Sequence, residues 1–221
     1  MKQTTYKLTI LLAIIFHSIL CFSQEKEIKI HFIGNCGLHM TDGNIDVYMD
    51  FPYKSGAFGY MEYDKSFLDS IPENSIFIFT HKHADHYSKK VLKTIIKERD
   101  GKAFTQWKSR KLKKFSNTIS DFDVQLVKTK HRFSLKHNSI LLTWHGKRLF
   151  FSGDTEDPKI LERFNNIDLA FISPWLYKYG QNRNIRIDAK KTALYHLYPS
   201  NKIDDEYASD LLVLKNQGEI I

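Results

Sequence analysis

The segment "THKHADH" (80–86) concentrates side chains that bind metals. His81, His83, Asp85 and His86 follow an apolar run that predicts a buried strand. In an extended chain, residues i and i+2 point the same way, so His81 and His83 can reach one ion together. A turn after them can aim Asp85 and His86 at a second position. Imidazole and carboxylate are ligands that zinc accepts. A solvated polar turn is the alternative, and four such residues in so short a segment disfavour it.

One ion needs three or four protein ligands, so remote residues must complete the site. Asp154 in "LFFSGDT" ends an apolar strand, where a buried carboxylate is costly unless a cation pairs with it. Its alternative role is to cap a helix beginning near Pro158. His131 and His137 flank one loop, and either can be the third ligand of the first ion. His196 lies near the end of another apolar segment.

The other histidines and the cysteine are weaker candidates. His31 lies within a predicted strand, and His145 lies in a turn that we expect at the surface. His39 lies in the first loop and is a candidate for lining the substrate pocket. Cys36 is expected to be structural.

The elements that must position these residues follow from the pattern of apolar positions. Strands are predicted over 27–34, 44–51, 75–80, 122–131, 139–144, 149–154 and 167–173. Helices are predicted after Ser88, over 158–164 and over 204–219, while 192–199 fits either type. Segment 35–43 is expected to be a loop or hairpin, and 52–66 an excursion near the site. Because helices follow strands in both halves, we expect a layered α/β domain.

The length of 221 residues, 42% of them hydrophobic, suits one globular domain. Residues 1–23 have a basic start and an apolar stretch shorter than the roughly 20 residues of a spanning helix. They predict a signal peptide, with 24–221 as the exported domain, secreted or periplasmic. A retained anchor and a lipoprotein modified at Cys21 are the alternatives. After cleavage Cys36 is the only cysteine, so no internal disulfide is expected.

The motifs "THKHADH", "LFFSGDT" and a final histidine before "LYPS", with a lone histidine near position 131, resemble the metallo-β-lactamase superfamily over about residues 28–200. The resemblance implies a single-domain αββα sandwich with the site at one edge between two sheets. The short segments between the motifs are most similar to the lactonase-like and phospholipase-D-like branch.

The resemblance also implies roles for individual residues. The first ion would be held by His81, His83 and His131, and the second by Asp85, His86 and His196, with Asp154 bridging them. Asp85 and Asp154 would be the catalytic carboxylates, and Asp50 would lie behind the ligands and orient one of them. A histidine at position 83, where the oxygen-reducing di-iron members have glutamate, favours hydrolysis over redox chemistry. Asp154 also differs from the cysteine of the best-known lactamase subgroup.

The implied function is hydrolysis of an ester, lactone or phosphodiester bond by water activated between two divalent ions. Zn²⁺ is the expected metal, with Mn²⁺ or Fe²⁺ as alternatives. A β-lactam hydrolase and an inactive metal-binding module are the competing functions. A complete set of seven ligand positions favours an enzyme.

The substrate is less constrained by the sequence. Residues 89–114 contain eleven Lys or Arg and two acidic residues. They form either a rim that gathers an anionic substrate, small or lipid, or the solvated faces of two helices. Segment 173–186, with Trp175 and Tyr177, is expected to be a loop that contacts substrate. Export argues against a nucleic-acid partner.

Overall fold

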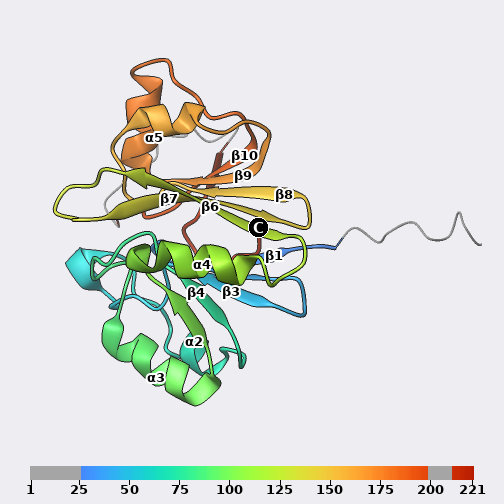
Figure 1. Ribbon diagram of the computed structural model, residues 1–221. Helices are drawn as coiled ribbons and strands as arrows, with labels where there is room; N and C mark the ends of the chain where they lie inside the picture. The colour runs from blue at the N-terminus through green and yellow to red at the C-terminus, as the bar shows by residue number, and fades with distance from the viewer. Residues whose placement is uncertain (1–25, 199–210) are drawn as a thin grey trace, which may run out of the picture.

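The computed structural model describes residues 26–198 and 211–221, which form two facing β-sheets with helices outside both (Figure 1). The first sheet has the order β1-β2-β3-β4-β5. Its strands are Lys29–Gly34 (β1), Gly37–Thr41 (β2), Asp46–Met49 (β3), Ile76–Ile78 (β4) and Lys102–Phe104 (β5). The second has the order β11-β10-β9-β8-β7-β6. Its strands are Phe122–Thr129 (β6), His137–Trp144 (β7), Lys147–Phe151 (β8), Ile167–Ile172 (β9), Ala189–Leu194 (β10) and Leu211–Val213 (β11). The predicted αββα sandwich is confirmed.

The helices complete the outer layers. The first sheet is covered by α2 (Ser66–Asp69) and α3 (Lys89–Arg99), and the second by η3 (Pro158–Glu162) and α5 (Pro174–Gln181). α4 (Ser109–Ser116) packs against β5 and β6, the edge strands of the two sheets. η3 is a 3-10 helix, and two shorter 3-10 turns are η1 (Ala57–Gly59) and η2 (Gln106–Lys108). Among the described residues, no helix combines the length and apolarity needed to cross a bilayer.

Alternation along the strands builds the core. In β7, Ile140 and Leu142 point into the layer between the sheets, whereas Leu141 packs in the outer layer beside α5. Phe151 and Phe171 stack between the sheets with ring centroids 5.1 Å apart. Both faces of the second sheet are therefore buried, which explains its long apolar runs.

Strand direction determines where the functional residues meet. β3, β4 and β5 run parallel, and so do β8, β9 and β10. Parallel strands bring their carboxyl ends to one edge of a sheet, and ligands commonly bind there. The segments after β3, β4, β8 and β10 consequently gather at one end of the sandwich.

Three predicted segments differ in the structure. Residues 37–41 form β2 because Leu38 and Met40 alternate into the core, which leaves only a tight turn before them. Segment 173–186 begins as α5, with Pro174 in its first turn. The predicted helix 204–219 is described only from residue 211, and there it begins with the strand β11, which pairs with β10. Residues 204–210 and the predicted signal peptide 1–23 lie outside the described residues.

Candidate metal centre

The seven predicted ligands converge at the edge where the strands end. Four follow β4, and the others follow β6, β8 and β10: His81, His83, Asp85, His86, His131, Asp154 and His196. Their donor atoms form two groups that share Asp154.

The first group contains three imidazoles and one carboxylate oxygen. His81 Nε2 and His131 Nε2 each lie 3.6 Å from Asp154 Oδ2. His131 Nε2 lies 3.1 Å from His83 Nδ1. His81 Nε2 is buried and has no hydrogen-bond partner among the described residues. Such an atom is costly to bury and suits a bound cation.

The second group is tighter and fully buried. His86 Nε2 lies 2.9 Å from His196 Nε2 and 3.0 Å from Asp154 Oδ1. His196 Nε2 lies 3.3 Å from both Asp154 Oδ1 and Asp85 Oδ2. Tetrahedral ligands about 2.0–2.2 Å from an ion are themselves about 3.3–3.6 Å apart. The 3.6 Å contacts of the first group and the 3.3 Å contacts of the second match this spacing, whereas the 2.9 and 3.0 Å contacts of His86 are shorter. The two oxygens of Asp154 face separate groups.

Asp50 supports both groups from behind. His86 Nδ1 donates to Asp50 Oδ2 at 3.0 Å, which leaves Nε2 free to face the centre. Thr80 Oγ1 donates to the same oxygen at 2.7 Å and lies 3.1 Å from His81 Nδ1, from which it can accept. The Thr80 backbone N–H donates to Asp50 Oδ1 at 2.8 Å. One buried carboxylate thus orients a histidine of each group, directly or through Thr80.

We expect Asp50→Asn to weaken metal binding about 10- to 100-fold, because the amide cannot accept all three hydrogen bonds. Chelator competition measures this affinity. Asp46→Asn is the matched control, since Asp46 also belongs to the first sheet but pairs with His39 at 2.7 Å. Equal metal affinity in both variants would contradict the orienting role.

His131 and His137 occupy different positions in the structure. His131 joins the first group, whereas both ring nitrogens of His137 are engaged by the protein. Asp154 N donates to His137 Nε2 at 2.9 Å, so Nδ1 carries the proton and donates to Thr129 Oγ1 at 2.7 Å. Gly153 has φ +57°, and a Cβ there would lie 2.4 Å from His137 Nε2. His137 therefore packs beneath Asp154 and holds its backbone, and burial lowers the pKa of its ring to about 3.

The two groups differ in their electrostatics. Burial and the neighbouring imidazoles lower the pKa of His81 and His131, so both rings are neutral near pH 7. Burial also opposes charge on His86 and His196, but the Asp154 carboxylate outweighs it and raises the pKa of both rings. The same histidines keep the pKa of Asp154 well below its usual range despite its burial. Protons therefore compete with a metal mainly in the second group.

A pocket of about 480 Å³ opens onto the centre. Its lining combines ligands with aromatic and charged side chains, namely Phe58, Tyr60, His83, Asp85, His131, Arg132, Phe133, Asp154, Glu156, Trp175 and Tyr198. The excursion 52–66 and Trp175 reach the site as predicted. No residue of 89–114 lines this pocket, so these lysines and arginines fit the alternative that they form the solvated faces of two helices. The cationic side chain in the lining is Arg132.

Three predicted positions are wrong. His39 does not line the pocket: it points to the outer face of β2, stacks on Tyr48 with ring centroids 4.6 Å apart and bonds Asp46. Tyr177 lies two positions after Trp175 in α5, about 200° around the helix, and its hydroxyl accepts from Gln181 Nε2 at 2.7 Å. His145 is largely buried, not at the surface, because its Nε2 pairs with Asp42 at 2.7 Å.

Asn35 of the β1–β2 turn was missed as part of the site. Asn35, with φ +50°, donates from Nδ2 to the Asp85 carbonyl at 2.8 Å and accepts from His196 N at 2.7 Å. The signal available in the sequence was an asparagine in a tight turn, just before Cys36 and Gly37. Asparagine is one of the few residues that readily adopt the left-handed backbone conformation. Cys36 Sγ lies 3.2 Å from His86 Nδ1, and burial raises the pKa of this thiol, so it packs as a neutral group.

Comparisons with solved structures place the chain in a known fold. A candidate metal-dependent hydrolase from Parabacteroides distasonis is 22% identical with a TM-score of 0.59, covering 86% of this chain and 92% of that chain. The metallo-β-lactamase fold protein YhfI from Bacillus subtilis is 13% identical with a TM-score of 0.59, covering 88% and 98%. A diphosphatase of the PhnP family is 9% identical with a TM-score of 0.60, covering 88% and 97%.

The chain therefore has the metallo-β-lactamase fold, which the sequence motifs predicted. No family model and no curated protein matches the sequence. The resemblance to the lactonase-like and phospholipase-D-like branch remains a prediction.

Proposed function

We propose that this protein is a metal-dependent hydrolase that holds two divalent cations and cleaves an ester, lactone or phosphodiester bond. Zn²⁺ is the metal we expect. The observation that carries the proposal is the position of the Asp154 carboxylate between two groups of histidines. Its Oδ1 faces one group and its Oδ2 faces the other. Ions held there would activate a water molecule and polarise the scissile oxygen.

The side chains around the ligands suit this reaction. Asp85 directs Oδ2 at His196, while its buried Oδ1 has no hydrogen-bond partner among the described residues. This free oxygen can position the attacking water and accept its proton. Tyr60 lines the pocket, and burial together with the Asp154 and Asp85 carboxylates raises the pKa of its phenol. Tyr60 therefore stays protonated and can donate a hydrogen bond to a developing oxyanion.

Arg132 gives the pocket its cationic side chain and favours an anionic substrate. Phe58, Phe133 and Trp175 supply apolar surface beside it. A substrate with an apolar part and a negative charge near the scissile bond matches this lining best.

Metal analysis followed by a substrate screen tests the proposal. We expect about two bound ions, and turnover of bis-p-nitrophenyl phosphate or an aryl lactone that a chelator abolishes and added Zn²⁺ restores. His83→Ala should lose metal and turnover, while His39→Ala, a histidine outside both groups, should keep them. Turnover of a chromogenic cephalosporin alone would indicate a β-lactam hydrolase. Full metal occupancy with no turnover of any substrate would indicate an inactive binding module.

A further inference from the structure

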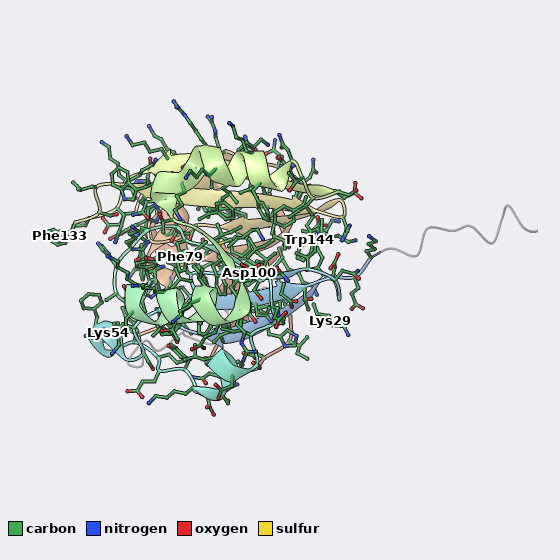
Figure 2. The ribbon with its side chains drawn as sticks, turned by 60° about the horizontal axis from the view of Figure 1, so that its bottom comes forward. Lys29, Lys54, Phe79, Asp100, Phe133 and Trp144 are labelled. Atoms are coloured by element: carbon green, nitrogen blue, oxygen red, sulfur yellow. The ribbon has the colours of Figure 1, made fainter. Side chains whose placement is uncertain are left out.

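The loop between β6 and β7 carries two of the most exposed apolar side chains of the described residues. Phe133 is 88% exposed and Leu135 is 93% exposed. Figure 2 shows Phe133 projecting from the edge of the molecule. Apolar side chains exposed together beside a functional pocket commonly mark a surface that binds a partner.

One contact joins this loop to His83 of the candidate metal centre, and others lie within the loop. The carbonyl oxygen of Phe133 lies 3.3 Å from His83 Nε2, and Ser134 N donates to the His131 carbonyl at 3.2 Å. Phe133 has φ +60°, a left-handed conformation that aromatic residues rarely adopt. Ser134 Oγ also donates to the Lys136 carbonyl at 3.0 Å. These contacts fix the backbone conformation of the loop, and that conformation directs the Phe133 ring outward.

A second exposed apolar group lies across the pocket. Phe58 of η1 is 63% exposed and Tyr198 is 42% exposed, and both line the pocket with Phe133. The Tyr198 hydroxyl donates to the Phe58 carbonyl at 2.6 Å. η1 and the β6–β7 loop lie on the same side of the molecule, at the left of Figure 1. Apolar side chains therefore flank the pocket entrance from loops of both sheets.

Basic residues surround the exposed apolar residues of the β6–β7 loop. Segment 128–136 contains four cationic residues and no acidic ones, namely Lys128, Lys130, Arg132 and Lys136. The Lys136 ammonium also lies 5.4 Å from the ring centroid of Trp107, which is 56% exposed. Glu156 and Asp157 lie beside Lys130 and Arg132 and offset part of this charge. The loop thus alternates cationic side chains with exposed apolar ones.

We infer that the β6–β7 loop docks on an anionic lipid bilayer. Phe133 and Leu135 would insert at the boundary between headgroups and acyl chains, as apolar residues of interfacial segments do. Lys130, Arg132 and Lys136 would meet the lipid phosphates, where each basic residue adds to binding. The pocket entrance would then face the membrane surface. The inference does not depend on which bond the centre cleaves, because docking requires no turnover.

Vesicle flotation of the purified protein tests this inference. The vesicles are phosphatidylcholine alone, or phosphatidylcholine with about a third phosphatidylglycerol. Wild-type protein should float with the anionic vesicles and be released at high salt, since screening weakens exposed charges. Phe133→Ser combined with Leu135→Ser should weaken retention roughly 10-fold or more, from lost apolar burial. Lys130→Glu combined with Arg132→Glu should have a similar effect.

Ile220→Ser is the matched control, because Ile220 is 68% exposed but pairs with His31 in the first sheet. It should bind vesicles as the wild type does. Circular dichroism and thermal melting show that each variant is folded. The inference is overturned if wild-type protein binds no vesicles, if it binds neutral and anionic vesicles equally, or if the loop variants bind as well as Ile220→Ser. Vesicle binding without hydrolysis would support the docking surface and count only against the proposed enzyme.

Discussion

Replacing Asp154 with asparagine is expected to lower bound metal and to reduce turnover by about 1,000-fold or more, equivalent to ~4 kcal/mol. Oδ1 of Asp154 faces His86 and Oδ2 faces His81, at 3.0 and 3.6 Å. Asparagine offers one neutral oxygen, so at least one group loses a ligand and both lose negative charge. Metal stoichiometry and turnover number are the measurements.

Asp168→Asn is the control for this substitution. Asp168 pairs with Lys190 at 2.7 Å and accepts from Arg148 N at 2.8 Å, outside both groups of metal-binding side chains. This variant should keep both ions and full turnover. Unchanged metal content and turnover in Asp154→Asn would show that the carboxylate does not bridge.

The second large effect is a difference between the two metal-binding events in their dependence on pH. Neighbouring carboxylates raise the pKa of His86 and His196, so the metal-free protein retains protons there near neutral pH. A metal must displace these protons, and affinity should rise about tenfold per pH unit for each proton released. His81 and His131 have lowered pKa values and are already neutral, so these two rings should release no proton when an ion binds near neutral pH.

Calorimetric titration at several pH values, in buffers with different ionisation enthalpies, counts the released protons. Binding at the group of His86 and His196 should release protons at pH values below their raised pKa values. Binding at the group of His81 and His131 should release almost none above about pH 7. His39→Gln should leave both events unchanged, since His39 lies outside the groups. Two events with the same pH dependence would contradict the electrostatic difference between the groups.

The parts of the site that the sequence predicts well are local. His81, His83, Asp85 and His86 follow one buried strand, so their spacing alone places them near each other. A similarly local signal, the apolar residues within each segment, predicted seven of the strands, namely β1, β3, β4, β6, β7, β8 and β9. Asp154 was identifiable because a carboxylate at the end of an apolar strand needs a partner.

The positions that sequence reasoning missed depend on pairing between strands. His39 was misplaced because β2 was not recognised, and once it pairs with β1 and β3 the alternation turns His39 to the outer face. His131 and His137 flank the same loop, and only the β6–β7 register, which pairs His137 with Thr129, separates them. Asn35 acts through its backbone and amide, so no metal-ligand pattern points to it.

The centre draws on both sheets: four of its side chains follow β4, and three follow strands of the second sheet. His86 and His196, which meet at 2.9 Å, are 110 positions apart in the chain. An ion held by both would close a loop of that length, as a long-range cross-link does. Cys36 is the one cysteine within the described ranges, and it is unpaired. No disulfide in those ranges therefore cross-links the chain as the ion would. Metal starvation would then act on this protein much as a reducing agent acts on a fold held by disulfides.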